Sequence, residues 1–497
     1  MSAAADQVTV AHLRLSGFGS TVEVPFAVGE GVDRIAVEAV ARGHASFGIG
    51  LFDPRGAAYQ SPGFRGVYGS ERHDFWVSAR GASEGFLPGP IPAGRWTLVF
   101  PVFRSLAATD VDVTVRLRHG PAVAPLAPAP VPELVRDIPG WYRGDLHVHS
   151  TASSDAASTG TALAPEAWAD ECRRAGLDFV ALTDHNVVAQ NRALAGADGT
   201  GVLLLGGEEM TNWSHGHATV AGMATDDWLD WRQRPRGLRL GRHEARITDL
   251  LRTAEEMGAY VAAAHPLQLL VTWQFFAEAR THGIEVWNGH FSPTDAAAVA
   301  RWDSLLRRGQ RIAGSGGSDL HGRDNLAGIS AGMPTTVVHA EALSRRAVLA
   351  ALRAGRSYLT RRPGGPGVVV WAQGADGVRR IMGETVRAHR GTPVPVGATV
   401  RGGRGLRLLL IADGRVRLRR RLHADDETVT TTVRSGEVRY LRAELHGRAS
   451  FDPRRPLAGR LDMEALTNPV YLAEGRPGDE AAAGEAWWDV RRVQVPL

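Results

Sequence analysis

The sequence predicts an α/β protein in which a barrel or doubly wound sheet lies between two β-rich parts. Short strand-like segments occupy residues 1–119, strands alternate with helices over 141–363, and strands and turns return over 364–497. The Pro/Ala-rich stretch 120–140 has no packing face and is typical of a semi-rigid linker. A chain of 497 residues is also too long for one hydrophobic core, which favours two or three domains.

The N-terminal part consists of short apolar segments separated by glycine and proline. These segments are residues 20–28, 33–41, 46–56, 94–103 and 110–119. Such spacing predicts a β-sandwich over residues 1–119.

The middle part alternates apolar runs with helical patterns. The runs, typical of buried parallel strands, cover residues 177–184, 201–208, 217–223, 259–265, 283–288, 310–319 and 334–340. Helical patterns cover 246–258, 295–309 and 344–355, and each ends at a glycine that can cap a helix. Residues 364–497 then predict a second, smaller β-domain.

Composition is that of a soluble globular protein, with 44% hydrophobic and 22% charged residues. The first residues show neither the basic nor the apolar region of a leader peptide, and no run approaches the roughly 18 apolar residues of a membrane span. We therefore expect a cytoplasmic protein without membrane contact. The single cysteine, Cys172, lies in a helical pattern and is expected to be a small buried residue.

The basic residues argue only weakly for a nucleic-acid partner. The chain has no lysine, and its formal net charge is only +4. The densest arginine run, residues 413–423, alternates with Val416 and Leu418, which predicts a half-buried strand with one solvated face. A nucleic-acid footprint would also carry lysine and interleaved aromatic residues.

Polar residues recur at the ends of the apolar runs in the middle part. They are His147, His149, Asp184, His185, Glu208, Glu209, His217, His265, Asp319 and His321. In a barrel, residues that follow the carboxyl ends of strands meet at one rim. Imidazoles and carboxylates without thiolates suit zinc, manganese or iron, and their number exceeds what one ion can use. Two or more ions can share a bridging hydroxide, so the expected chemistry is hydrolysis.

The same residues lie in motifs that resemble a known family. GDLHVHS, ALTDHN, GGEEMT, GHATVAG, AHP and GSDLHG, in this order over residues 141–360, closely resemble the polymerase-and-histidinol-phosphatase (PHP) superfamily. The flanking GLFDPRG, FRGVYGS, LPGPIPAGRWTLVF and MEALTNPVYL resemble its CehA/McbA branch, which includes carbaryl hydrolases.

The resemblance implies a distorted seven-stranded barrel with two or three divalent ions. It implies that one ion is held by His147, His149, Glu209 and Asp319, that Glu209 bridges to a second ion held with His217 and His265, and that Asp155, His185 and His321 hold a third. The patterns favour Glu209 over Glu208, and His217 over His215. Asp184 is expected to orient a ligand rather than to bind metal.

Roles beyond the ligands are less defined by the sequence. Asp319 is the candidate for proton transfer, and Arg323 and Asn288 are candidate substrate-binding residues; Trp213 and His290 could also line a pocket. The substrate is expected to be a small ester, possibly anionic, with a phosphoester placed first. A carbamate or carboxyl ester of the carbaryl type is the alternative.

The sequence also allows two other function classes. The N-terminal part could bind carbohydrate through exposed aromatic residues such as Phe75, Trp76 or Trp96, although a scaffold role is favoured. A PHP-like editing domain that acts on nucleic acid is disfavoured, because no polymerase segment accompanies it. Oligomeric state cannot be derived from the sequence.

Overall fold

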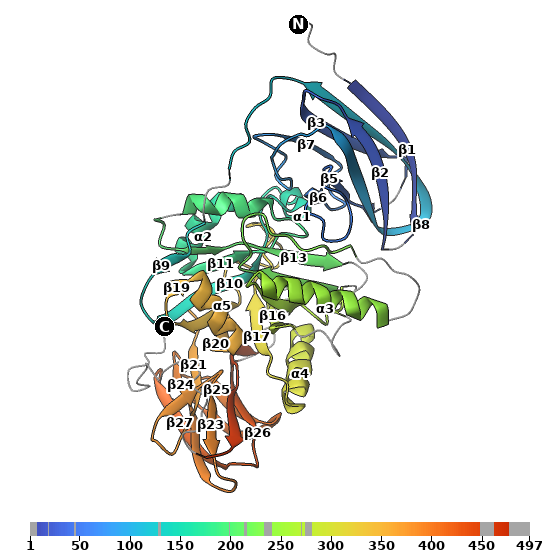
Figure 1. Cartoon of the computed structure of the whole chain (residues 1–497). Coiled ribbons are helices and arrows are strands. Elements are labelled where there is room, and N and C mark those ends of the chain that lie inside the picture. The colour runs from blue at the N-terminus through green and yellow to red at the C-terminus, as the bar shows by residue number, and fades with distance from the viewer. Residues whose placement is uncertain are drawn as a thin grey trace.

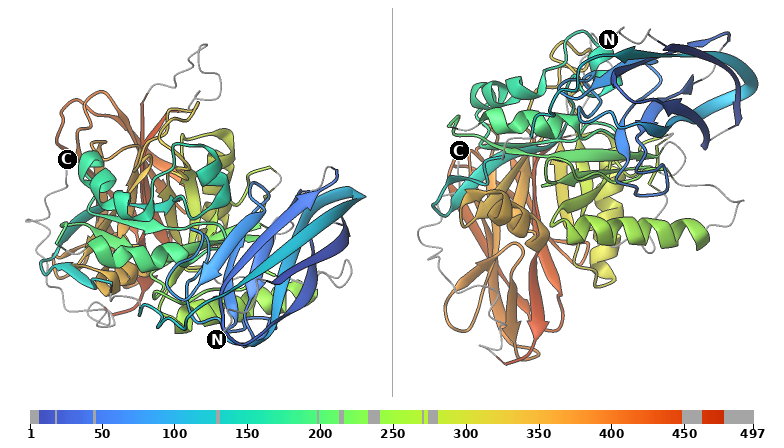
Figure 2. Two further views of the ribbon diagram at one scale, coloured as in Figure 1. Left: turned by 90° about the horizontal axis from the view of Figure 1, so that it is seen from above. Right: turned by 45° about the horizontal axis from the view of Figure 1, so that its top comes forward.

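A computed structural model describes residues 7–17, 19–43, 46–127, 131–197, 199–212, 216–232, 241–269, 271–273, 281–447 and 462–476. In this part of the chain strands predominate and helices are few, which gives an α/β protein. The N-terminal strands lie at one end, the helices and the strands between them form the middle, and the C-terminal strands lie at the other end (Figure 1). The views in Figure 2 keep the same order.

The helical elements all lie in the middle of the chain. They are α1 (Ser154–Ser158), η1 (Pro165–Ala167), α2 (Trp168–Ala175), η2 (Ala189–Ala197), α3 (Gly241–Glu256), α4 (Pro293–Arg307) and α5 (Arg345–Ala354). The three helices predicted over 246–258, 295–309 and 344–355 are confirmed as α3, α4 and α5. Cys172 on α2 is buried, as predicted.

The strands before residue 120 form one eight-stranded sheet. They are β1 (Gln7–Gly17), β2 (Ser20–Val28), β3 (Val32–Ala41), β4 (Ser46–Phe47), β5 (Ile49–Phe52), β6 (Phe64–Tyr68), β7 (Asp74–Ser78) and β8 (Gly94–His119). The two strands predicted over 94–103 and 110–119 are one continuous strand, β8. Its first half pairs with β2 and its second half with β1 and β3, so one strand joins both groups of neighbours.

Part of the N-terminal sheet packs against the middle of the molecule. Phe64 on β6 stacks on Trp228 with ring centroids 4.1 Å apart, and Phe52 on β5 meets the same indole edge-on at 5.8 Å. Arg232 donates hydrogen bonds to the carbonyls of Ala57 and Ala58. Because these side chains are mostly excluded from water, the N-terminal strands and the middle share a hydrophobic cluster.

Most of the middle strands belong to two open sheets, and two of them form a separate short sheet. They are β9 (Leu134–Arg136), β10 (Gly140–Val148), β11 (Phe179–Leu182), β12 (Leu203–Leu205), β13 (Gly207–Asn212), β14 (Gly216–Ala221), β15 (Tyr260–Ala264), β16 (Gly283–Asn288), β17 (Ala313–Gly317), β18 (Thr335–Ala340), β19 (Leu343–Ser344) and β20 (Ser357–Thr360). One sheet runs β12-β11-β10-β18-β20 and continues into the C-terminal strands, and the other runs β13-β14-β15-β16-β17.

Among the described residues, these sheets do not close into the distorted seven-stranded barrel that the resemblance implies. The β20 edge pairs with a C-terminal strand instead of closing the sheet, and the β13–β14, β14–β15 and β10–β18 pairs are antiparallel rather than parallel. Isolated bridges, His185 to Glu209 and Val148 to Leu320, connect the two sheets where strands of each end. These bridges bring polar strand ends from both sheets together.

The C-terminal strands complete the molecule. They are β21 (Gly367–Gln373), β22 (Arg379–Ile381), β23 (Thr385–Ala388), β24 (Pro393–Arg401), β25 (Arg407–Ala412), β26 (Arg415–Arg421), β27 (Glu427–Arg434), β28 (Tyr440–His446), β29 (Met463–Thr467) and β30 (Val470–Glu474). The arginine-rich strand β26 lies at a sheet edge. The predicted half-burial is wrong for Val416, which is 48% exposed, whereas Leu418 is partly buried against the C-terminal core.

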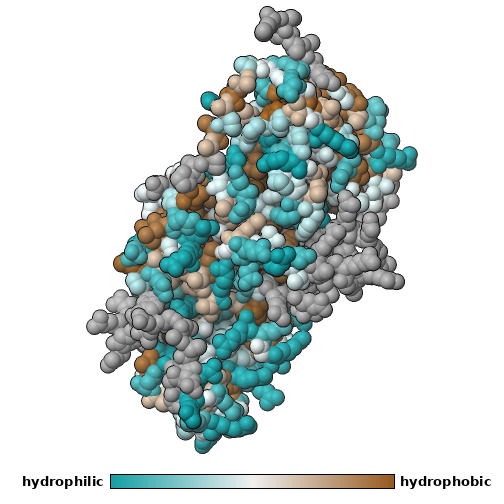
Figure 3. Space-filling model, viewed as in Figure 1, coloured by the Kyte–Doolittle hydropathy of each residue, from teal (hydrophilic) through white to brown (hydrophobic). Residues whose placement is uncertain are grey.

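The surface in the view of Figure 3 carries hydrophobic residues scattered among hydrophilic ones. Within the described ranges, no helix combines the length and the apolar character needed to cross a bilayer.

Candidate metal centre

The nine residues predicted as metal ligands lie in one cluster where the two sheets meet. His147 is on β10, Glu209 on β13 and His217 on β14, and the others follow the ends of β10, β11, β15 and β17: His149, Asp155, His185, His265, Asp319 and His321. Four overlapping triads have donor atoms within 4.8 Å of one another: His149/His185/His321, His147/Glu209/His265, His147/His149/Asp319 and His185/Glu209/His217. The donor set is therefore concentrated enough to hold divalent metal.

Glu209 lies at the centre of this cluster and is fully buried. Its Oε1 lies 2.8 Å from His217 Nδ1 and 3.1 Å from His265 Nε2. Its Oε2 lies 2.8 Å from His185 Nδ1, 3.3 Å from His147 Nε2 and 3.5 Å from His149 Nε2. One carboxylate thus faces five imidazoles, with its two oxygens directed toward different groups, as a bridging ligand requires.

Asp319 and Asp155 extend the cluster in two directions. Asp319 Oδ1 lies 3.0 Å from His149 Nε2 and 3.4 Å from His147 Nε2. Asp155 Oδ2 lies 3.1 Å from the Nε2 atoms of both His185 and His321. Asp155 therefore belongs to the cluster despite the small-residue loop that precedes it.

The histidines of the cluster differ in pKa. Burial would lower the pKa of four of them, but neighbouring carboxylates raise it: His147, His185, His265 and His321. Burial and the neighbouring His321 and His185 lower the pKa of His149 to about 3, and burial lowers the pKa of His217 to about 4, so both are neutral imidazoles near pH 7. Burial would raise the pKa of Glu209, but the surrounding histidines hold it well below its usual range, so it is a carboxylate. Neutral imidazole and ionised carboxylate are the forms that bind metal.

Unpaired atoms in the cluster also fit a metal ion. His147 Nε2, His149 Nδ1, His265 Nδ1 and Glu209 Oε2 are buried and have no hydrogen-bond partner among the described residues. Burial of unpaired polar atoms is costly unless another ligand compensates. For His147 Nε2 and Glu209 Oε2, which face one another within the cluster, a shared cation would supply that compensation.

Backbone geometry brings the ends of β10 and β17 unusually close. A Cβ atom at Gly317 would lie 2.4 Å from His147 Cβ and 2.6 Å from its backbone nitrogen, so only glycine fits there. Just beyond it, Asp319 has a φ of 54° and its N–H donates to the His147 carbonyl at 2.8 Å. His265 also has positive φ, 24°. Non-glycine residues with positive φ are often found at functional sites, where the surrounding contacts hold the strain.

Glu285 supports the cluster and was not singled out from the sequence. Its Oε1 lies 3.1 Å from His147 Nδ1, while its Oε2 accepts hydrogen bonds from the His265 backbone N–H at 2.7 Å and from Asn288 at 3.1 Å. A carboxylate on the far nitrogen of a metal-binding histidine fixes its tautomer and orientation. The available signal was an acidic residue between the apolar Ile284 and Val286 of a buried strand.

Two further aspartates hold the loops that carry the ligands. Asp184 accepts hydrogen bonds from the Ser150 N–H at 2.7 Å and its hydroxyl at 2.8 Å, so it orients the loop after His149 rather than a histidine ring. Asp145 accepts the backbone N–H groups of His147 and Ser318 at 3.2 and 2.9 Å. Burial raises the pKa of both aspartates to about 6.

The remaining candidates divide between the cluster and other places. Asn288 contacts it: its Nδ2 donates to Asp319 Oδ2 at 3.3 Å. Arg323 is instead bound to Glu171 on α2, with Nη2 to Oε2 at 2.6 Å. Glu208 points to the opposite side of β13 and accepts the Leu229 N–H. Trp213 and His215 lie outside the described residues.

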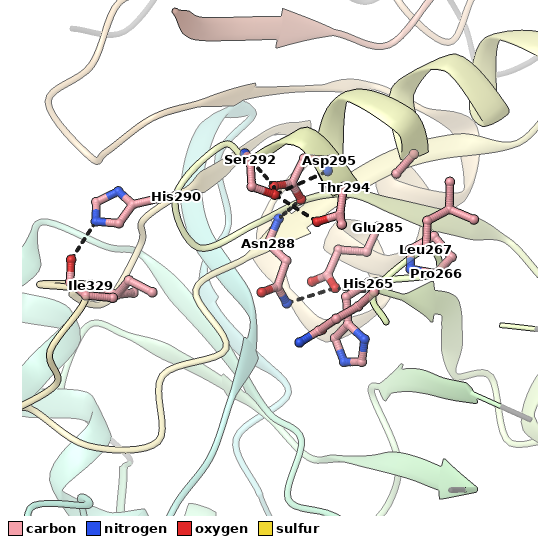
Figure 4. A pocket seen from close by; sticks show the side chains of 13 residues that line it. His265, Pro266, Leu267, Glu285, Asn288, His290, Ser292, Thr294, Asp295 and Ile329 are labelled. Atoms are coloured by element: carbon pink, nitrogen blue, oxygen red, sulfur yellow. Dashed lines mark hydrogen bonds between the residues drawn. The ribbon is translucent and has the colours of Figure 1, made fainter. Parts of the chain in front are cut away.

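A pocket of about 200 Å³ adjoins the cluster on the side of His265 and Glu285. Figure 4 shows Asn288 between Glu285 and Asp295 in this pocket, with its amide directed at Glu285. His290 lines the far side and contacts the Ala327 carbonyl. The pocket therefore lies beside the ligand cluster and is lined by both polar and apolar residues.

The aromatic residues considered for carbohydrate binding are not an exposed platform. Phe75 is 2% exposed and Trp96 is fully buried, and both pack in the N-terminal core. Trp76 is half-buried beneath the guanidinium of Arg34, 4.1 Å from its ring centroid. The expectation of exposed rings is thus wrong for Phe75 and Trp96.

Comparison with known proteins finds only distant structural likenesses. No family model and no curated protein matches the sequence. A solved structure from Bacteroides vulgatus ATCC 8482, described as a two-domain protein containing a predicted PHP-like metal-dependent phosphoesterase, is 19% identical. The match covers 70% of this chain and 100% of that chain, with a TM-score of 0.35. This likeness is too distant to establish a common fold.

Proposed function

We propose that this protein is a metal-dependent hydrolase that acts on a phosphoester. The observation that carries the proposal is the cluster itself, in which Glu209 contacts five histidines and two aspartates extend the donor set. This donor set suits two or three ions of zinc, manganese or iron. It has no thiolate, so it does not resemble a structural zinc site.

The ligands divide into three groups around the bridging Glu209. We assign His147, His149, Glu209 and Asp319 to one ion, Glu209, His217 and His265 to a second, and Asp155, His185 and His321 to a third. Histidines bind metal in the neutral form, so in the loaded centre only three carboxylates would offset the charge of the ions. The loaded centre would be cationic, which favours an anionic ester over a neutral carbamate.

Bound ions would supply Lewis-acid activation of water and stabilisation of negative charge in the transition state. Asp319 would accept a proton from the attacking water and deliver it to the leaving group. It is suited to this role because its side chain is 20% exposed, whereas Glu209 is inaccessible. Asn288 would hold Asp319 Oδ2 through its amide and line the pocket that receives part of the substrate.

A parallel assay tests this function. Metal-loaded protein is given a nitrophenyl phosphoester and a nitrophenyl carbamate, and both bound metal and nitrophenol release are measured. We expect phosphoester turnover to dominate, and His147→Ala to lower both metal content and the rate, the latter on the order of 100-fold or more. His389→Ala, a change at an exposed histidine of the C-terminal part, is the matched control.

The outcomes separate the parts of the proposal. Full activity in His147→Ala would refute the assignment of the centre. Dominant carbamate turnover that His147→Ala abolishes would keep the metallohydrolase and refute the phosphoester as substrate.

A further inference from the structure

The loop that carries Asp155 is enclosed between the middle of the molecule and the N-terminal strands. On one side Asp184 binds the N–H and the hydroxyl of Ser150. On the other side Ala152, 1% exposed, packs in the cluster that contains Val67 and Leu87 of the N-terminal part. The loop therefore lies between two parts of the chain, and Figure 1 shows α1 beside β6.

Ser154 is the point at which the N-terminal part binds this loop. Its side chain is buried, and its Oγ accepts the Gly69 N–H at 2.9 Å and donates to Glu71 Oε2 at 2.9 Å. A Cβ atom at Gly69 would lie 2.9 Å from this hydroxyl and 2.7 Å from Glu71 Oε2, so glycine permits the close approach. Ser70 adds a hydrogen bond to Glu71 Oε1 at 2.7 Å, which holds the carboxylate in place.

The next residue, Asp155, uses its two oxygens for different tasks. Its Oδ1 accepts hydrogen bonds from the Ser153 hydroxyl at 2.6 Å and the Ala156 N–H at 2.7 Å. Its Oδ2 faces His185 and His321, each at 3.1 Å. The helix that begins here, α1, has only five residues, so helix propensity alone cannot fix its orientation. Local hydrogen bonds hold Oδ1, and contacts with other parts of the chain must hold the short helix itself.

We propose that the segment Gly69–Glu71 is a positioning element of the metal centre, which fixes Asp155 through Ser154. This inference rests on the proposed function, because it assigns Asp155 to the ion held with His185 and His321. Glu71 and Ser154 are positioning residues: they act on the centre through the loop and do not touch the reacting atoms. The N-terminal strands therefore contribute to the centre although none of the candidate ligands lies on them.

The test is calorimetric titration of the metal-free full-length protein with zinc. Partners that orient a ligand are worth 10- to 100-fold in metal affinity, so we expect Glu71→Ala and Ser154→Ala to weaken one class of zinc site by about that factor. The other zinc sites should keep their affinity. Glu71→Gln keeps a carbonyl acceptor for the Ser154 hydroxyl and should retain most of the wild-type affinity.

Glu38→Ala is the matched control, because Glu38 is an exposed residue of the same sheet that pairs with Arg116 at 3.2 Å. The proposal is overturned if Glu71→Ala and Ser154→Ala bind zinc like the wild type while His321→Ala loses one site. It is also overturned if they weaken every site equally, which would indicate general destabilisation. Failure of the wild type to bind zinc would instead refute the proposed function.

Discussion

The role of Glu285 gives the most demanding prediction. Three donors converge on its two buried oxygens: His147 Nδ1 on Oε1, and the His265 N–H and Asn288 amide on Oε2. The substitution Glu285→Gln preserves size but replaces one acceptor oxygen with an NH2 group. In either orientation of the new amide, its NH2 group faces a group that donated a hydrogen bond to the carboxylate: His147 Nδ1 in one, the His265 N–H and the Asn288 amide in the other.

The two orientations have different costs. If the amide oxygen faces His147, the His265 N–H loses its acceptor, and a buried unsatisfied donor costs about 1–3 kcal/mol. If the NH2 faces His147 Nδ1, that nitrogen must become the acceptor and the proton moves to Nε2, the atom directed at Glu209 and Asp319. Metal binding at Nε2 then requires loss of that proton, which we expect to weaken affinity 10- to 100-fold, or about 1.4–2.7 kcal/mol.

The assay is zinc titration together with urea denaturation of the metal-free protein. Glu285→Gln should weaken zinc binding, lower the free energy of unfolding, or do both to a smaller extent, according to the orientation that the new amide adopts. Glu341→Gln, at an exposed position between β18 and β19, serves as the control and should change neither. Wild-type affinity and wild-type stability together in Glu285→Gln would refute the positioning role of this carboxylate.

Two further predictions concern the ends of the molecule. Burial would raise the pKa of Glu444, but the charge of Arg442 and a hydrogen bond from His446 hold it at about 2. Since an unfolded glutamate titrates at about pH 4.3, this carboxylate should contribute about 3 kcal/mol of stability above that pH and lose it as the pH falls toward 2. Urea denaturation at several pH values should therefore show the gap between wild type and Glu444→Gln narrowing toward low pH, and a constant gap would contradict the assignment. Where the N-terminal strands meet the middle, Trp228→Ala removes the indole that stacks on Phe64 and should lower the free energy of unfolding by about 3–5 kcal/mol. A loss below about 1 kcal/mol in urea denaturation would show that this contact does not hold the N-terminal strands.

Local patterns predicted three helices and the buried strands of the middle part. The ends of the strands were predicted less well, because the run over 201–208 is divided between β12 and β13 and Glu209 lies within β13. The glycine-terminated patterns became α3, α4 and α5, because amphipathic spacing and a helix stop are both local. Alternation of buried residues such as Val113 and Val115 predicted strands, but not that two predicted strands would join as β8. Continuity through residues 104–109 depends on strand partners far away in the sequence.

The open sheets show that alternating strands and helices in a sequence do not by themselves predict a barrel. The pattern identifies buried strands but not the partner that each edge takes. Here β20 pairs with β29, about a hundred residues later in the chain, and this pairing extends the sheet instead of closing it. The pairing of edge strands depends on residues far apart in the sequence, and the hydrophobic periodicity of one strand does not indicate its partner.

The sequence by itself determined the chemical character of the centre: the kinds of donor, their order along the chain and their positions at the ends of apolar runs. These are local features, because a residue at the end of a strand is defined by the pattern before it. Only the tertiary structure decided that Glu285 lies behind His147, 138 residues away, and that Glu71 binds the loop of Asp155 through Ser154, 83 residues away. Such contacts depend on which faces pack together, and a single sequence carries no periodic signal for them.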